Sequence, residues 1–151
     1  MTSVSVRVQT ASFDIAAEVA HLKRHAGVGA VVTFSGICRD EDGRLAALEL
    51  EHYPGMAEEE IGRIAAEAVA RWSLAGVTVV HRFGRIAVGD DIVLVATAAT
   101  HREPAFAAAS YLMDYLKTRA PFWKKEHPVA AGSGEWVAAR DTDETATRRW
   151  R

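Results

Sequence analysis

The sequence predicts an α+β fold with a mostly antiparallel sheet and three helices. Stretches that alternate apolar and polar residues, as half-buried strands do, and stretches with a helical repeat of apolar residues follow one another in the order β-α-β-β-α-β-β-α-β. In two places consecutive strands are separated only by a short turn-rich segment, which favours antiparallel hairpins over a doubly wound parallel sheet. The length of 151 residues is typical of one domain, so residues 1–151 are expected to form a single unit.

The composition is that of an ordinary globular protein. Hydrophobic residues make up 49% and charged residues 25% of the chain, which excludes disordered, collagen-like and coiled-coil classes. The formal net charge of -2 argues against a nucleic-acid-binding protein. No apolar run reaches the roughly 18 residues of a membrane span, and the first residues lack a signal-peptide pattern, so we expect a cytoplasmic protein that does not enter the membrane.

Neither a metal ion nor another cofactor is expected from the sequence. The single cysteine, Cys38, excludes an internal disulfide and any motif that needs two cysteines. The histidines show no paired spacing of the kind that metal ligands have, and no glycine-rich phosphate loop or serine-centred nucleophile motif is present.

The first two elements are a strand and a helix. Residues 4–8 alternate valine with polar side chains, which predicts a half-buried strand. Ser12 is a typical N-cap residue, and apolar side chains recur at helical spacing after it, so a helix is expected from there to Gly27.

A β-hairpin is expected next. The segment 28–39 is rich in β-branched residues. The segment 45–53 alternates, with Leu48 and Leu50 on one side and Glu49 and Glu51 on the other. Between them, residues 40–43 read Asp-Glu-Asp-Gly, a composition that supplies turn dihedral angles.

The middle of the chain predicts a helix followed by two further strands. The helix covers residues 56–74, with acidic residues in its first turn, and Gly76 ends it. Strands are expected at 77–83 and 92–100, joined across residues 84–91. The second of these strands is apolar or small on both faces and should therefore lie inside the sheet.

The last elements are a third helix and a short strand. The helix should run from about residue 103 to 118, with Phe106 and Met113 on its apolar face. A strand-like stretch lies at 135–137, and the tail from about residue 140 is the part we expect to be flexible.

Positive charge is concentrated where the third helix ends. The cations of this segment are Lys117, Arg119, Lys124 and Lys125, with Glu126 beside them. Because Pro121 turns the chain, Lys124 can fold back toward Lys117. Crowded lysines have lowered pKa values and become candidate acids, bases or nucleophiles, but the same pattern also fits a solvated basic surface. The aromatic residues Phe122 and Trp123 could desolvate the lysines and stack on a flat ligand, or simply pack against the sheet.

Two further positions could bind an anion. His101 and Arg102 lie between a strand and a helix N-terminus, where free backbone N–H groups attract anions, although such a histidine is also a common structural hydrogen-bonding group. Successive side chains of a strand point to opposite faces. If Phe34 and Cys38 of the strand at 28–39 face the core, Arg39 therefore faces the other way and can reach a cleft.

The motifs quoted next resemble one known family. They are GAVVTFSGICRD, LELEHYPGMAE, HRFGRIAVGDDIVLV, THREPAF and, most specifically, MDYLKTRAPFWKKE. Together they resemble the large, catalytic subunits of molybdopterin synthase over residues 29–150. The resemblance implies an α/β-hammerhead-like fold and a sulfurtransferase of molybdenum cofactor biosynthesis.

The resemblance also implies a substrate, partners and site residues. The family converts cyclic pyranopterin monophosphate into molybdopterin, with sulfur supplied by the C-terminal Gly-Gly thiocarboxylate of a small ubiquitin-like subunit. It forms a homodimer with one partner at each end, a heterotetramer. This chain ends in Arg-Arg-Trp-Arg, so we expect it to accept that tail and not to donate one. The implied catalytic residues are Lys117 and Lys124, and the implied substrate-binding residues are Ile37, Cys38, Arg39, His101, Arg102, Lys125 and Glu126.

Two other functions remain open at this point. A non-catalytic module that binds a phosphorylated ligand would keep the basic cleft but show no dependence on a ubiquitin-like partner. A single-stranded RNA-binding protein would use Phe122 and Trp123 as stacking platforms, but it would need a wider basic track than this net charge supplies.

Overall fold

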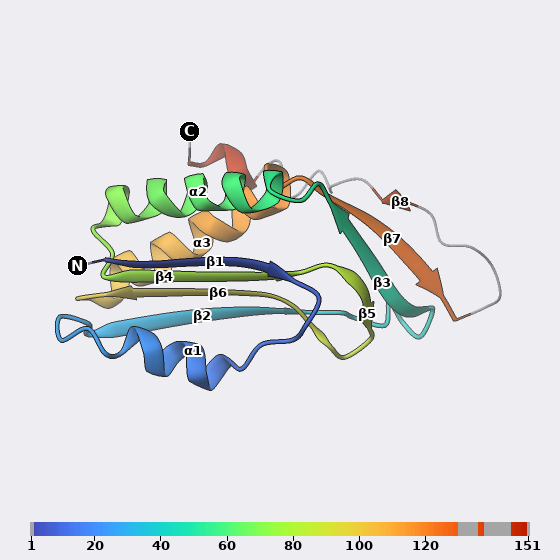
Figure 1. Cartoon of the computed structure of the whole chain (residues 1–151), viewed down its shortest axis with the longest axis horizontal. Helices are drawn as coiled ribbons and strands as arrows, with labels where there is room; N and C mark the ends of the chain where they lie inside the picture. The colour runs from blue at the N-terminus through green and yellow to red at the C-terminus, as the bar shows by residue number, and fades with distance from the viewer. Residues whose placement is uncertain (1, 130–135, 138–145, 151) are drawn as a thin grey trace.

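The protein folds into two four-stranded sheets, with the second placed at one end of the first (Figure 1). The computed structural model describes residues 2–129, 136–137 and 146–150. The first sheet has the order β1 (Ser3–Gln9), β4 (Gly76–Arg82), β6 (Asp91–Ala99) and β2 (Ala30–Ile37). The second sheet has the order β5 (Gly84–Ala87), β3 (Leu45–His52), β7 (Phe122–Pro128) and β8 (Trp136–Val137). All described pairings are antiparallel except that of β1 with β4.

Helices cover both faces of the first sheet. Figure 1 shows α2 (Met56–Trp72) and α3 (Arg102–Thr118) on one face and α1 (Ile15–Leu22) on the other. The main core lies between the first sheet and the α2–α3 layer, and a smaller one lies under α1. Strand β6 contributes to both, because Val93 and Val95 face α2 and α3 while Ala96 and Ala98 face Leu22. Its predicted place inside the sheet is confirmed.

Local sequence explains where the helices begin. The Asp14 carboxylate accepts a hydrogen bond of 3.2 Å from the Ala17 backbone N–H, so the N-cap of α1 is Asp14 and not Ser12 as the sequence predicts. In α2 the Glu58 side chain accepts from the Gly55 backbone N–H, and Glu59 adds a second acid to the first turn. None of the helices in the described part of the chain is long and apolar enough to span a membrane.

The expected hairpin between residues 28–39 and 45–53 is wrong. Strand β2 pairs with β6 in the first sheet, and β3 pairs with β5 and β7 in the second. The turn at 40–43 exists, with positive φ at Glu41 and Asp42, but the chain crosses there from one sheet to the other. Alternation shows that a segment is a strand, but it does not identify the strand to which it pairs.

Two strands and two side-chain orientations also differ from expectation. Neither β5 nor β7 is predicted. β5 has only four residues, and in β7 the strand-forming Phe122 and Trp123 are followed by charged and polar residues with no apolar alternation. Phe106 is 62% exposed rather than on the apolar face of α3, which is formed by residues such as Ala105, Ala108 and Leu112. Phe34 is 41% exposed and does not point into the core.

A small core joins the two sheets. Cys38, Leu45, Leu50 and Ile86 are buried in it, and Ile92 packs against both this cluster and the main core. The register of β2 against β6 shifts between Gly36 and Ile37, just before the chain crosses to the second sheet. The junction of the sheets therefore lies beside the end of β2.

Candidate active site

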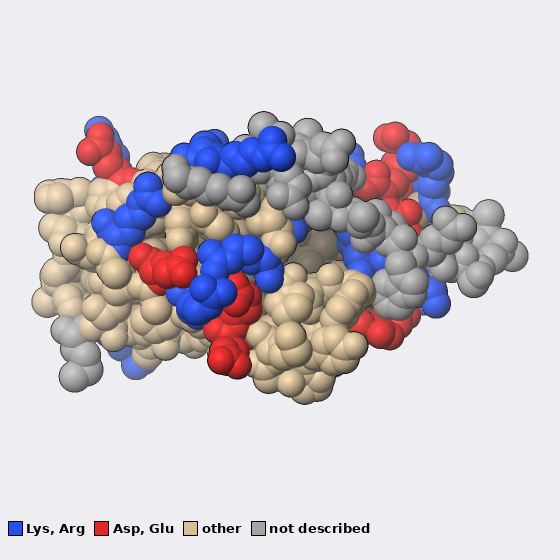
Figure 2. All heavy atoms as spheres, turned by 90° about the horizontal axis from the view of Figure 1, so that it is seen from above, with Lys and Arg blue, Asp and Glu red and all other residues tan. Residues whose placement is uncertain are grey.

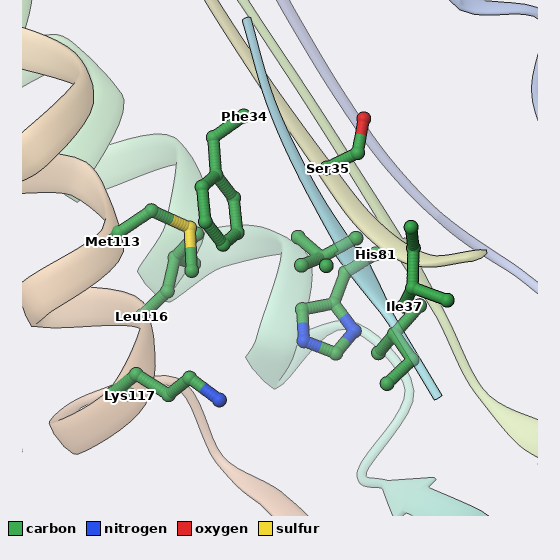
Figure 3. Close-up of a pocket in the computed structure, with 10 residues that line it drawn as sticks. Phe34, Ser35, Ile37, His81, Met113, Leu116 and Lys117 are labelled. Atoms are coloured by element: carbon green, nitrogen blue, oxygen red, sulfur yellow. The ribbon is translucent and has the colours of Figure 1, made fainter. Parts of the chain in front are cut away.

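A cavity of about 340 Å³ opens next to this junction. It is lined by Phe34, Ser35, Gly36 and Ile37 of β2, His81 of β4, Ile92 and Val93 of β6, and Met113, Leu116 and Lys117 of α3 (Figure 3). Most of these side chains are apolar. His81 and Lys117 are the two titratable groups among these described residues, so they are the candidates for ionic or proton-transfer chemistry by this part of the wall.

Lys117 reaches the cavity from the last turn of α3. Residues 113, 116 and 117 lie on one face of the helix because they are spaced by three and four positions. Figure 3 shows the Lys117 side chain extending from the helix with its amine directed toward the cavity. Among the described residues no carboxylate lies within ion-pair distance of Lys117. Its charge is therefore available to an anionic ligand.

Lys124 lies on β7, beside the same region. It is paired with Leu50 of β3, and cross-strand partners share a sheet face, so Lys124 lies on the face of Leu50 and the small core. The positive charge of Lys124 acts to lower the pKa of the Cys38 thiol, although burial outweighs it and the pKa of Cys38 is raised. Two residues earlier on the same face, Phe122 stacks on His81 with the ring centroids 3.9 Å apart. Lys124 itself does not line the cavity.

Three expected site residues follow one another at the end of β2, and each lies in a different environment. Ile37 is 55% exposed and lines the cavity. Cys38 is 1% exposed, and its side chain lies in the small core. The Arg39 side chain is 66% exposed and forms an ion pair of 2.9 Å with Glu41. Arg39 is thus near the cavity in sequence but does not line it.

His101 and Arg102 lie at the opposite end of α3 from Lys117. His101 is the N-cap of the helix and Arg102 its first residue, and both are exposed. With fifteen residue steps between Arg102 and Lys117, the rise of an α-helix separates their backbones by roughly 22 Å. Within one chain, therefore, these two residues do not join the cavity.

Lys125 and Glu126 follow Lys124 on β7 but differ in orientation. Lys125 is paired with Glu49 and Glu126 with Leu48. Because successive side chains of a strand point to opposite faces, Glu126 shares the face of Lys124 and Lys125 faces the other way.

His81 is a cavity residue that the sequence analysis did not single out. It follows Val77 and Val79 on one face of β4, and both valines are fully buried in the main core. A histidine that continues a buried valine pattern is a signal that sequence alone could have offered. Burial lowers the pKa of His81 to about 4, and the nearby charge of Lys117 contributes to the same shift. The imidazole is therefore neutral at physiological pH.

The outer face of α2 and α3 carries balanced charge. Figure 2 shows this face, where basic side chains lie next to acidic ones. Arg63 lies 2.6 Å from Glu60, and Arg119 lies 3.1 Å from Glu60 and 3.5 Å from Glu67. These arginines are therefore already paired with carboxylates. Within the described ranges, no group of three or more His, Cys, Asp or Glu side chains is placed to hold a metal ion.

Comparison with known proteins places the chain in a family. The family model described as "MoaE protein" matches residues 8–119. A molybdopterin synthase catalytic subunit of Mesorhizobium japonicum is 63% identical over 148 residues, which cover 97% of this chain and 93% of that protein.

Solved structures agree with the sequence relatives. The molybdopterin biosynthesis MoaE protein of Burkholderia ambifaria superposes with a TM-score of 0.83 at 50% identity, over 97% of both chains. A structure described as the complex of subunits 1 and 2 of molybdopterin-converting factor from Helicobacter pylori shares the fold, with a TM-score of 0.71 and 18% identity over 90% of both chains. The chain therefore belongs to the MoaE family of molybdopterin synthase catalytic subunits.

Proposed function

We propose that the chain transfers sulfur from the thiocarboxylated C-terminus of a small ubiquitin-like subunit to cyclic pyranopterin monophosphate, forming the dithiolene of molybdopterin. Each transfer forms one C–S bond on the pterin side chain and breaks the C–O bond at the same carbon, whose oxygen leaves on the phosphate or as water. Water then hydrolyses the resulting thioester, so that the partner's tail leaves as a carboxylate and the sulfur stays on the pterin as a thiolate. Membership of the MoaE family supports the reaction class. The observation that carries the proposal is the cavity with the Lys117 amine directed into it.

The cavity suits a small, flat and anionic ligand. A volume of about 340 Å³ lies within the range of small-molecule sites, and such sites are mostly apolar with a few polar groups. The ring of Phe34 and the apolar side chains of α3 provide surface for a heterocycle. The substrate phosphate and the thiocarboxylate are both anions, so the positive charges of Lys117 and Lys124 favour bringing them together.

The two lysines have different places and are given different roles. Lys117 lines the cavity and acts as acid or base at the carbon that receives sulfur. Lys124 lies beside the cavity on β7 and holds the thiocarboxylate or the oxyanion of the acyl adduct. In this proposal Ile37 and Glu126 lie on the side of these two groups, whereas the side chains of the buried Cys38 and of Lys125, on the other face of β7, make no contact with a substrate in the same chain's cavity.

A homodimer is part of the proposal. His101 and Arg102 lie roughly 22 Å along α3 from Lys117, so they can act on a substrate in this cavity only if a second copy supplies them. Arg39 is assigned to the same shared anion site. Strand β2 is an edge of the first sheet and carries the exposed Phe34, and α3 carries the exposed Phe106. In the proposed dimer these exposed apolar side chains would be covered by the second copy.

The small partner subunit and the location complete the proposal. The related fold from Helicobacter pylori is described as a complex of two subunits, which supports a partner for this chain as well. We place the protein in the cytoplasm, where the free thiol of Cys38 remains reduced.

Reconstitution tests the proposed reaction. The chain is mixed with a thiocarboxylated Gly-Gly partner and cyclic pyranopterin monophosphate, and dithiolene formation is measured. Wild type should turn over, and Lys117→Ala should lower kcat by about 100-fold or more, because one acid–base group contributes 10²–10⁴-fold. Lys23→Ala, at an exposed position after α1, is the matched control and should keep normal turnover. A wild-type chain that binds the pterin but never forms dithiolene would support a binding module instead.

A further inference from the structure

His81 occupies a position in which its ring is fixed but one nitrogen is left for a ligand. The imidazole stacks on Phe122 with an interplanar angle of 14°. Its Nδ1 lies 2.9 Å from the backbone oxygen of Arg82. A carbonyl oxygen only accepts hydrogen bonds, so in the neutral ring Nδ1 carries the proton and donates it to Arg82. Nε2 is then a hydrogen-bond acceptor with a free lone pair.

Nε2 is accessible from the cavity. No described residue forms a hydrogen bond with Nε2. If Nε2 were also fully buried, it would be a buried polar atom without a partner, but among the described residues the sole such side-chain atom is Arg7 Nε. Nε2 is therefore not sealed inside the protein. Because His81 lines the cavity, the open side of Nε2 is the cavity itself (Figure 3).

The cavity wall thus carries complementary polar groups. The Lys117 ammonium can only donate hydrogen bonds, and Nε2 of the neutral His81 can only accept them. Around them the lining formed by the described residues is apolar apart from Ser35 and backbone groups. A ligand in this space would pair with both side chains if it placed an acceptor or anionic group toward Lys117 and an N–H or O–H donor toward His81.

We propose that His81 is a specificity-determining residue, whose Nε2 accepts a hydrogen bond from an N–H or O–H group of the substrate bound next to Lys117. This inference rests on the proposed function and names one contact within it. A polar ligand with both donors and acceptors, such as the pterin ring system and its hydroxyl groups, fulfils the requirement. A ligand without such a donor would leave Nε2 desolvated and unpaired, and would bind more weakly.

Enzyme kinetics with two His81 variants test the contact. His81→Phe keeps an aromatic ring against Phe122 but removes the acceptor, and His81→Gln provides an amide oxygen as a replacement acceptor. We expect His81→Phe to raise the KM for cyclic pyranopterin monophosphate by about 10- to 100-fold with a smaller effect on kcat, and His81→Gln to restore most of the loss. His52→Phe is the matched control, because His52 also contacts Phe122 but does not line the cavity. Its KM should stay within about twofold of wild type. An unchanged KM in folded His81→Phe would overturn the inference.

A measurement on the unmodified chain removes any dependence on how the variants fold. The ¹⁵N NMR signals of His81 at neutral pH should be those of a neutral ring protonated on Nδ1, and the Nε2 signal should shift when cyclic pyranopterin monophosphate is added without the partner subunit. A ring protonated on Nε2, or an Nε2 signal that does not respond to bound pterin, would refute the contact. Failure of the wild-type complex to form dithiolene would instead refute the proposed function, so the two failures are distinguishable.

Discussion

Arg119, the C-cap residue of α3, reaches across to Glu60 of α2, with its Nη2 3.1 Å from the carboxylate oxygen. The same guanidinium lies 3.5 Å from Glu67 and 4.8 Å from the centre of the Tyr115 ring. These contacts attach the end of α3 to α2 two residues after Lys117. The position of the lysine in the cavity therefore depends on a charged contact made outside the cavity.

Glu60 should contribute to stability above its ordinary pKa. Hydrogen bonding from Arg63, together with the charge of Arg119, lowers the pKa of Glu60 below its usual 4.5. A carboxyl whose pKa is lower in the folded state stabilises the fold above pH 4.5, and this contribution disappears as the pH falls through the folded-state pKa. Glu60→Gln should lower the free energy of unfolding by about 1 kcal/mol at pH 7 and by less at pH 3. Urea unfolding at both pH values checks this, with Glu59→Gln, an exposed neighbour, expected to change little.

Two glycines should respond to alanine in opposite directions. Gly62 lies in the middle of α2, and a Cβ there would meet no heavy atom within 4 Å. Gly62→Ala should therefore raise the free energy of unfolding by about 0.5–1 kcal/mol. At Gly29 a Cβ would lie 2.2 Å from the Thr100 backbone oxygen, so Gly29→Ala should destabilise by about 1–3 kcal/mol. Thermal unfolding of the two variants tests the pair, and an equal effect of both would contradict this account.

The sequence identifies strands and helices better than it identifies which strands pair with one another in a sheet. The strand at 92–100 is apolar on both faces, and this alone places it correctly inside a sheet. The expected hairpin fails because β2 takes its partner from a strand more than 50 residues later, and a local turn signal does not report such a contact. On α3 the predicted apolar face is displaced by about one residue, because alanines at 105 and 108 pack closely while the larger Phe106 stays outside.

In the candidate site, too, the sequence predicts what depends on neighbouring residues of one helix and misses what depends on contacts between distant segments. Lys117 reaches the cavity through its place on α3, which the sequence predicts. His101 and Arg102 share that helix, and the helical rise separates them from Lys117 in a single chain. His81 lines the cavity from the end of β4 and stacks on Phe122 of β7, a strand that the sequence does not reveal. Charge and composition therefore point to the lysines but not to the neutral group beside them.

Trp150 should stabilise the α2–α3 layer. Its ring makes edge-on contacts with Trp72 and Tyr111, at centroid distances of 5.8 and 5.7 Å, and its Nε1 donates a hydrogen bond to Asp114. Trp150→Ala should lower the free energy of unfolding by about 1–3 kcal/mol through the loss of these aromatic and polar contacts. Arg148→Ala, at an exposed position two residues earlier, should change it by less than about 0.5 kcal/mol. Equal urea midpoints for wild type and Trp150→Ala would show that the contacts contribute nothing.

Cys38 should be chemically inert in the folded protein. The side chain is 1% exposed, and burial raises its pKa, so thiolate is scarce and shielded at neutral pH. An aromatic disulfide reagent should react on the order of 100-fold more slowly with the native protein than with the protein unfolded in urea. If the native protein reacted as fast as the unfolded one, Cys38 would have to lie open to the cavity. The variant Cys38→Ala provides the blank for the assay.

His81 should make the protein less stable in mild acid. Its folded-state pKa of about 4 lies below the usual value of 6.5, because burial disfavours the charged ring and Lys117 on α3 and His52 on β3 add positive charge nearby. The unfolded chain therefore binds the extra proton more readily between pH 6.5 and 4, so the free energy of unfolding falls as the pH drops through this range. The full shift corresponds to at most about 3 kcal/mol. Both His81→Phe and His81→Gln remove the titrating group, so urea unfolding between pH 7 and 4 should give a flatter profile for each than for wild type. A variant profile as steep as that of wild type would mean that other groups cause the acid sensitivity.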